Sequence, residues 1–243
     1  STKIYAYVEG KTLTCNVTIV QMNKKNVTLT PGSTTQLTLW GANKNVTWSS
    51  SNKKVATVSE DGLVTAVGNG TATITATFNG KKITSNINVI TLNLNHESVV
   101  LEYDGKFSLT RAGFGNVKKL AVTGTKEKVT WSTSNKNVAD VDSKGKVTAK
   151  GPGTAKITAE VNGIKVSCNV KVLKISYNEL TLKKGDTFSL KVLGTDSDIV
   201  WYSNKSTVAT VDENGFVTAV APGTAKIIAE VDGIVVRCIV TVK

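Results

Sequence analysis

The sequence predicts an all-β protein that consists of several small β-sandwich domains in tandem. Three observations lead to this fold class: a long segment recurs three times, apolar and polar residues alternate within it, and the dipeptides of tight hairpin turns separate its parts. The chain has 243 residues, of which 40% are hydrophobic and 20% are charged. No stretch keeps the 3.6-residue period of an amphipathic helix, and no apolar run reaches the ~18 residues of a membrane-spanning helix.

The repeated segment is centred on a tryptophan. The first copy reads VTWSSSNKKVATVSEDGLVTAVGNGTATITA around Trp48, the second reads VTWSTSNKNVADVDSKGKVTAKGPGTAKITA around Trp131, and the third reads IVWYSNKSTVATVDENGFVTAVAPGTAKIIA around Trp201. The copies align without a gap from each tryptophan to the end of the segment. A repeat of this length is typical of an array of similar small domains.

Each copy has the pattern of several short strands. In the second copy, Ile157, Ala159 and Val161 alternate with polar residues, which is the two-residue period of a strand with one buried face. The next residues are Asn162-Gly163, a dipeptide that supplies the positive φ angles of a tight hairpin. The corresponding dipeptides elsewhere are Asn79-Gly80, Asp232-Gly233 and Glu9-Gly10. About seven short strands per copy suit a two-sheet β-sandwich.

The repeat predicts three complete domains and part of a fourth. Residues 1–19 match residues 154–172 of the second copy. We therefore expect residues 1–19 to be the C-terminal strands of a preceding truncated domain, and the sequence to be a piece of a longer array. The complete domains are assigned to residues 20–90, 91–172 and 173–243, and the second of them carries a hairpin insertion near residues 110–120.

The run W-S-S-S-N…V-A-T-V…G-x-V-T-A…G-x-G-T-A-x-I-T-A resembles the bacterial immunoglobulin-like domain group 2, or Big-2, family over nearly the whole chain. The resemblance implies tandem immunoglobulin-like β-sandwich domains. It also implies surface-exposed arrays in bacteria, such as stalks and tips of adhesins of the intimin and invasin kind, or extensions of cell-wall proteins and secreted glycosidases. Because the junctions INVITLNLN and VKVLKISYN lack Gly, Pro and Ser-rich runs, we expect an extended, semi-rigid rod.

Equivalent positions of the copies hold the residues expected in the cores. Trp48, Trp131 and Trp201 share one position, and we interpret them as the large core aromatic of each sandwich. Cys168 and Cys238 share another position, on the inward side of the last strand. Each domain has at most one cysteine, so no intradomain disulfide is possible. We expect these side chains to be small buried hydrophobes, whereas the alternative, a reactive thiol, needs an exposed electropositive setting.

Trp40 is a candidate ligand contact. Leu37 and Leu39 take the inward parity of their strand, which places Trp40 outward, where the third copy is expected to have Lys191. An outward tryptophan suits a ligand platform, a contact with a neighbouring domain, or an ordinary surface position.

The insertion of the second copy supplies four more candidate contacts. Its extra residues lie within TRAGFGNVKKLAV and include Arg111, Phe114, Lys118 and Lys119. Insertions map to loops, and loops often carry binding function. A tolerated hairpin extension is the simpler interpretation, and a contact site for an anionic or glycan partner is the functional one.

The net charge of +12 is concentrated in two copies. The net charge is +5 for residues 20–90, +6 for residues 91–172 and 0 for residues 173–243. Lysines account for all of the basic residues except Arg111 and Arg237. Nucleic-acid sites favour arginine and known binding folds, so we expect no nucleic-acid partner. Scattered lysines suit solubility and strand-edge protection, or loose attraction to an anionic cell-wall polymer, a glycan or a host surface protein.

The sequence predicts a non-enzymatic function at the cell surface. One histidine, and no HExxH, CxxC or paired-acid motif, leave little material for catalysis, so we expect no enzyme, no cofactor and no metal site. The leading hypothesis is an adhesion or stalk segment of a bacterial cell-surface protein, located outside the cell and without membrane insertion by this segment. The alternative is an accessory glycan-binding or spacer module of a secreted carbohydrate-active enzyme.

Overall fold

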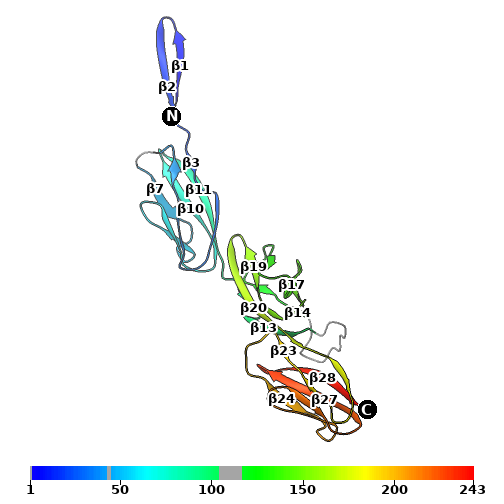
Figure 1. The fold of residues 1–243 in the computed structure, drawn as a ribbon. Coiled ribbons are helices and arrows are strands. Elements are labelled where there is room, and N and C mark those ends of the chain that lie inside the picture. The colour runs from blue at the N-terminus through cyan, green and yellow to red at the C-terminus, as the bar shows by residue number, and fades with distance from the viewer. Residues whose placement is uncertain (1, 43–44, 104–116) are drawn as a thin grey trace. The chain divides into compact units, whose positions relative to one another are not determined.

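The computed structural model describes residues 2–42, 45–103 and 117–243, which form strands and turns without any helix (Figure 1). The predicted all-β fold class is therefore confirmed for these residues. By backbone contacts the chain divides into two compact units. The first unit holds Ser1–Leu92, Gly124–Lys126 and Asn162–Ile164, and the second holds Asn93–Thr123, Glu127–Val161 and Lys165–Lys243.

The chain begins with a two-stranded antiparallel hairpin. Strand β1 (Thr2–Val8) pairs with β2 (Lys11–Val17), from Thr2 opposite Val17 to Val8 opposite Lys11. The turn residues Glu9 and Gly10 have φ angles of +47° and +75°. The same pair of positive φ angles occurs in the last hairpin of every complete copy, at Asn79-Gly80, Asn162-Gly163 and Asp232-Gly233. The dipeptides thus form the tight turns that they predict.

The first complete copy forms two main sheets. One sheet has the strand order β4-β11-β10-β7, in which β4 and β11 pair in parallel, and the other has the order β5-β9-β8. The first copy also has a short two-stranded pair, β3-β6. Its strands are β3 (Gln21–Met22), β4 (Asn26–Leu29), β5 (Thr34–Gln36), β6 (Leu39–Trp40), β7 (Thr47–Ser50), β8 (Ala56–Val58), β9 (Leu63–Ala66), β10 (Gly70–Phe78) and β11 (Lys81–Val89).

The second copy repeats this plan with the sheets β13-β20-β19-β16 and β14-β18-β17 and the short pair β12-β15. Its strands are β12 (Asn93–Leu94), β13 (Ser98–Glu102), β14 (Val117–Lys119), β15 (Val122–Thr123), β16 (Thr130–Thr133), β17 (Ala139–Val141), β18 (Lys146–Ala149), β19 (Gly153–Val161) and β20 (Ile164–Ile175).

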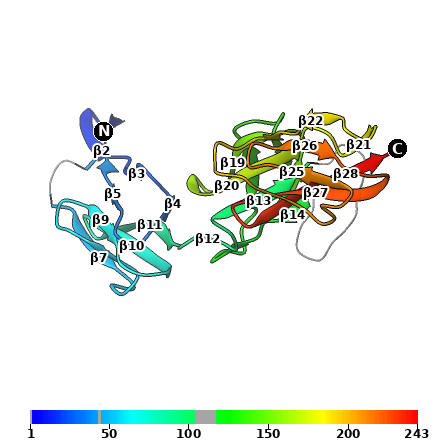
Figure 2. The ribbon, with the colours of Figure 1, turned by 60° about the horizontal axis from the view of Figure 1, so that its bottom comes forward.

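The third copy has the sheets β21-β28-β27-β24 and β22-β26-β25, and Figure 2 shows strands of both. Its strands are β21 (Glu179–Leu182), β22 (Thr187–Ser189), β23 (Val192–Leu193), β24 (Val200–Ser203), β25 (Ala209–Val211), β26 (Phe216–Ala219), β27 (Gly223–Val231) and β28 (Ile234–Val242). Its short pair is formed by β23 and the last two residues of β20, Lys174 and Ile175, which belong to the third copy.

Each copy contains its own hydrophobic cluster. Ile74, Ile157 and Ile227 occupy one equivalent position, and all three are fully buried. Cys168 and Cys238 are buried in the second and third clusters. The alternating pattern therefore corresponds to one inward face per strand, as in a two-sheet sandwich.

A glycine turn lies against the ring of each repeated tryptophan, which is partly buried and packs against the cluster of its copy. Gly62 has a φ of +85°, and a Cβ there would lie 2.8 Å from Cζ2 of Trp48. Gly215 has a φ of +81°, and a Cβ there would lie 3.0 Å from Trp201. The second copy has the same arrangement. Trp and Gly recur together because the ring occupies the space of a side chain at the turn.

Ser85 occupies the position of Cys168 and Cys238 in the first copy. Its hydroxyl has no hydrogen-bond partner, and the residue is 1% exposed. A buried hydroxyl without a partner costs about 1–3 kcal/mol. Replacing Ser85 by cysteine removes this cost and introduces the slightly larger thiol that the equivalent core position already holds in the other two copies, so Ser85→Cys should raise the free energy of unfolding of the first copy by about 1 kcal/mol in a urea titration. Cys168→Ser is the matched control and should destabilise the second copy. A Ser85→Cys protein less stable than the parent would contradict this assignment.

Candidate functional site

One strand links the second and third copies. β20 pairs in parallel with β13 as far as Leu173, and then antiparallel with β23 at Lys174 and Ile175. Its side chains are divided between two cores, because Val172 belongs to the second cluster whereas Leu173 and Ile175 belong to the third. Backbone hydrogen bonding therefore continues across the junction without a flexible segment.

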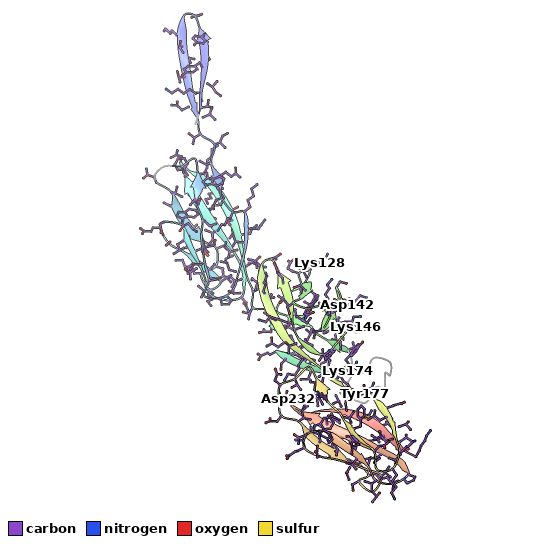
Figure 3. All side chains as sticks on the ribbon, in the orientation of Figure 1. Lys128, Asp142, Lys146, Lys174, Tyr177 and Asp232 are labelled. Carbon is purple, nitrogen blue, oxygen red and sulfur yellow. The ribbon has the colours of Figure 1, made fainter. Side chains whose placement is uncertain are left out.

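The turn after β23 is packed tightly against the second copy. Gly194 has a φ of +91°, and a Cβ there would lie 2.0 Å from the carbonyl oxygen of Val172 and 2.6 Å from the amide nitrogen of Gly153. Only a residue without a side chain fits this approach of two backbones. On the strand itself, the ammonium of Lys174 lies 5.7 Å from the ring centroid of Tyr103, the residue that directly follows β13; Lys174 is labelled in Figure 3.

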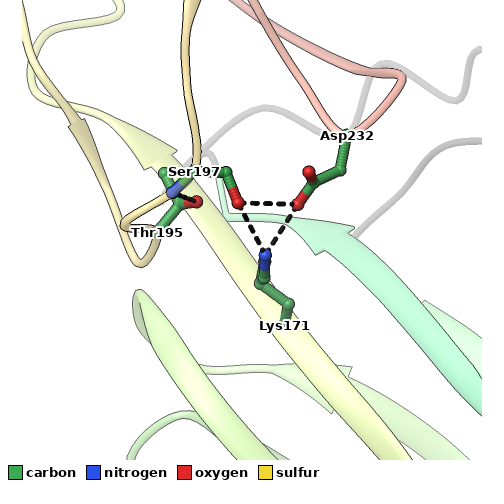
Figure 4. Close-up of polar contacts among 4 residues, drawn as sticks. All are labelled: Lys171, Thr195, Ser197 and Asp232. Carbon is green, nitrogen blue, oxygen red and sulfur yellow. Dashed lines mark hydrogen bonds and ion pairs between the residues drawn. The ribbon is translucent and has the colours of Figure 1, made fainter.

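A polar cluster spans the same junction (Figure 4). The ammonium of Lys171, on β20, donates to the Asp232 carboxylate at 2.6 Å and to the Ser197 hydroxyl at 3.3 Å. The Ser197 hydroxyl in turn donates to the same carboxylate oxygen at 3.2 Å. Thr195 holds the loop, because its hydroxyl accepts the Ser197 amide at 2.9 Å. Lys171 comes from the second copy and the other three residues from the third, so the cluster joins the two copies.

The hydrogen bonds of this cluster are those of a structural contact between two copies and not those of an activated serine. A lysine activates a serine only as a neutral base, whereas the Lys171 ammonium here donates to both oxygen atoms. Two grooves with volumes of about 660 and 520 Å³ flank Lys171. Among the described residues, their lining holds hydroxyl, amide and charged groups and no aromatic side chain on which a sugar ring would stack.

Lys171 lowers the pKa of the Asp232 carboxyl below its ordinary value, first by its hydrogen bond and then by its charge; Ser197 adds a hydrogen bond, and desolvation opposes the shift. A depressed folded-state pKa means that the contact stabilises above the ordinary pKa of aspartate and is lost as pH falls through the folded-state pKa. Replacing Lys171 by methionine should therefore raise the pKa of Asp232 toward its ordinary value in an NMR titration. Lys165→Met, at the exposed Glu160 pair, is the control and should leave Asp232 unchanged. An unaltered Asp232 pKa in Lys171→Met would contradict the contact.

The sequence alone did not point to this cluster. The position of Lys171 holds Asn88 in the first copy and Thr241 in the third, and the position of Asp232 holds asparagine in the first two copies, so repeat comparison gives no common charged pair there. One signal in the sequence could have indicated the cluster: Lys171 and Asp232 carry opposite charges at positions where the first copy has neutral asparagine.

Trp40 points outward as expected, with 62% of its surface exposed, while Leu37 and Leu39 are buried. Its counterpart differs from the expected Lys191. Trp40 pairs with Gln21 in the same way as Leu193 pairs with Lys174, so Leu193 is the equivalent residue. Strand register, including the glycine that follows in both copies, fixes this equivalence.

The strand that follows the insertion begins earlier than the sequence suggested, at Val117. Lys118 and Lys119 lie in strand β14, where Lys118 pairs with Val147 as Phe188 pairs with Val217. They are therefore strand residues of the second sandwich and not residues of an inserted loop. The expected position of these two lysines within the insertion is therefore wrong, because comparing residue types between copies does not specify strand register. Arg111 and Phe114 lie outside the described residues.

The cysteines of the cores are not poised for chemistry. Burial raises the pKa of the Cys168 thiol to about 11 and, with a smaller effect of Glu179, that of Cys238 to about 12. Few thiolates form at neutral pH under these conditions. Within the described ranges, no group of three or more His, Cys, Asp or Glu side chains gathers to hold a metal ion. No helix among the described residues is long and apolar enough to cross a membrane.

The family model of the bacterial Ig-like domain (group 2) matches residues 16–85, 116–168 and 169–236. An uncharacterized protein of Clostridium acetobutylicum is 35% identical over 55% of the chain and 14% of its own length. Ice-binding protein 1 of Shewanella frigidimarina is 27% identical over 94% of the chain and 30% of its own length. An alpha-L-arabinofuranosidase of Bifidobacterium longum is 36% identical over 39% of the chain and 9% of its own length. The chain thus spans less than a third of each relative.

Solved structures that match parts of the chain include a C-terminal fragment of intimin in complex with the intimin-binding domain of its translocated receptor. It is 18% identical, covers 68% of each chain and has a TM-score of 0.43. Invasin, a bacterial integrin-binding protein, is 14% identical over 98% of this chain and 63% of its own, with a TM-score of 0.34.

Proposed function

Because the chain belongs to the bacterial Ig-like domain (group 2) family, we propose that it is a stalk or adhesion segment of a bacterial cell-surface protein. In this function it projects or presents a binding region outside the cell. The observation that carries the proposal is the junction at β20, where one strand serves two sandwiches and Gly194 leaves no room between their backbones. A projecting segment needs this kind of junction, because a flexible linker would let the copies fold back on one another.

The partner we propose for this segment is anionic: a cell-wall polymer, an acidic glycan or an acidic host surface protein. The support is the surplus of lysines in the first two copies, including the exposed pair Lys81 and Lys82. Attraction of this kind is long-ranged in dilute salt and is screened within about 3 Å in 1 M salt.

The test is an array of cell-wall polymers, glycans and host matrix proteins, probed with the whole chain in low salt and in 1 M salt. We expect anionic spots to bind in low salt only, and Lys81→Glu with Lys82→Glu to weaken them several-fold. The matched control is Lys183→Glu with Lys184→Glu, an exposed pair in the neutral third copy. Equal losses from both double variants would mean that net charge acts alone, and an array without bound spots would contradict a binding role.

A second function is favoured by two relatives. Besides the arabinofuranosidase, a polysaccharide lyase 8 family protein of Enterococcus faecalis is 28% identical over 35% of the chain and 7% of its own length. The segment would then be an accessory or spacer module beside a catalytic domain, without enzymatic activity of its own. In this case we expect binding to neutral polysaccharides that resists salt and is lost in Trp40→Ala. Hydrolase or lyase activity of the segment itself would overturn both proposals.

A further inference from the structure

The third copy differs from the other two on one face of its larger sheet. Its strands β24, β27 and β28 lie side by side in this sheet (Figure 1). Six outward positions of these strands hold only Thr, Ser, Asn or Lys in the first two copies. In the third copy the same positions hold four aliphatic residues, a tyrosine and an arginine: Val200, Tyr202, Ile228, Val235, Arg237 and Ile239. The third copy alone thus has an apolar face where the other two have a polar one.

This face is open to solvent. Val200, Tyr202 and Ile239 are 62%, 42% and 37% exposed. Between the first two, Trp201 packs against the cluster on the inner side of the sheet. Contiguous apolar side chains on an outer face mark a contact with another protein, and such contacts favour tyrosine and arginine. Arg237 is one of only two arginines among 30 basic residues, and within the described ranges it forms no ion pair.

The strand register arranges the face as a small grid. Tyr202 lies opposite Ile228, and Ile228 lies opposite Arg237, so these three form a central row across the strands. On β27, Glu230 and Lys226 flank Ile228 on the same face, two residues away on either side. Neighbouring strands lie about 4.8 Å apart, and alternate residues of one strand lie about 6.8 Å apart, so the grid is nearly square.

A nearly square grid can pack on itself at a right angle, which is one of the two common angles between packed sheets. We consider a two-fold axis that runs across the face from Ile228 and passes between Arg237 and Glu230. The register then brings together an ion pair, a cation and an aromatic ring, and an apolar pair, each formed twice: Arg237 with Glu230, Tyr202 with Lys226, and Val200 with Ile239. Ile228 and Val235 lie on the axis and meet their own counterparts. The face is therefore self-complementary, as a two-fold contact requires.

We propose that this outer face of the third copy joins two molecules of the chain in a two-fold dimer. The third copy has no net charge, whereas the first two copies carry +5 and +6. Two molecules with a net charge of +12 each therefore meet with least repulsion at the third copy. One sheet face of a small domain is at the low end of specific interfaces, so the dimer is weak. The proposal goes beyond the stalk function and does not depend on it, since it rests on this face alone.

The test is sedimentation of the whole chain at concentrations up to about 1 mM, with Cys15→Ser to exclude a disulfide through the exposed thiol. We expect monomers in dilute solution and dimers at the upper end. Arg237→Glu and Glu230→Arg each bring like charges together across the contact, so each should weaken self-association at least about tenfold. Mixed in equal amounts, the two variants should associate again with nearly the affinity of the parent, because every carboxylate then faces a guanidinium.

Phe216→Lys is the matched control. Phe216 is 53% exposed on the other sheet of the third copy, and Lys146 holds its place in the second copy. This variant should dimerise like the parent. A parent chain that stays monomeric at about 1 mM would overturn the proposal and leave the face to a different protein. So would a mixture of the two charge variants that does not associate, or a Phe216→Lys protein that loses the dimer as fully as Arg237→Glu does.

Discussion

Replacing Trp201 by alanine is expected to unfold most of the third copy at temperatures where the parent is folded. The ring packs against the third cluster and against the Gly215 turn. Removing a large aromatic side chain from a core costs about 3–5 kcal/mol, and a domain of this size has a total stability of only about 5 kcal/mol. At about 4–8 °C per kcal/mol, the melting transition of this copy should fall by at least about 12 °C.

Tyr202→Ala is the matched control for this variant. Tyr202 is the next residue of β24 and is 42% exposed on the outward face, so its removal leaves the cluster intact. Calorimetry of the whole chain should show one transition moved far down in Trp201→Ala and a shift of a few degrees at most in Tyr202→Ala. If both variants melt alike, the tryptophan is not a core residue.

The second large effect is expected for Gly194→Ala. The added Cβ meets backbone atoms of Val172 and Gly153, which cannot move aside as a flexible side chain would. Positive φ costs an alanine about 1 kcal/mol, and overpacking costs about 1–3 kcal/mol more. We therefore expect the third copy to lose about 2–4 kcal/mol in a urea titration, or to move away from the second copy and relieve the clash.

Gly185→Ala separates the two contributions. Gly185 has a φ of +92°, nearly that of Gly194, but a Cβ there meets no atom within 4 Å. This control should lose only the cost of the positive φ. Equal effects of the two substitutions would show that the junction is looser than its backbone contacts indicate.

The positions that recur in every copy could be predicted from the sequence. The tryptophans and the Asn-Gly or Asp-Gly turns repeat at fixed spacing in all three complete copies, the inward cysteine repeats in two of them, and each of these features is local to one copy. A local feature is specified by neighbouring residues, through the two-residue strand period or through a turn that requires positive φ. The all-β sandwich fold followed from these features, and its immunoglobulin-like class followed from the resemblance to the group 2 family.

Register and contacts between copies could not be predicted in the same way. The pattern of the second copy assigns Lys118 to the insertion, whereas pairing with Val147 places it in a strand. Residue types compared along the chain do not specify register, because a strand takes its register from its partner. Lys171 and Asp232 are far apart in the sequence and meet only where two copies join. No property of a single repeat specifies such a pair.

The β20 junction should hold the second and third copies in one orientation, because backbone pairing continues through it. The most direct measurement is the distance distribution between two spin labels at Lys136→Cys and Ser206→Cys, which are exposed and follow equivalent strands, with Cys15→Ser to leave only buried native thiols. Replacing residues 174–176 by Gly-Ser-Gly provides the flexible reference. We predict one narrow distribution for the intact junction and a broad one for the reference. Equally broad distributions in both proteins would show that the junction does not hold the two copies in one orientation.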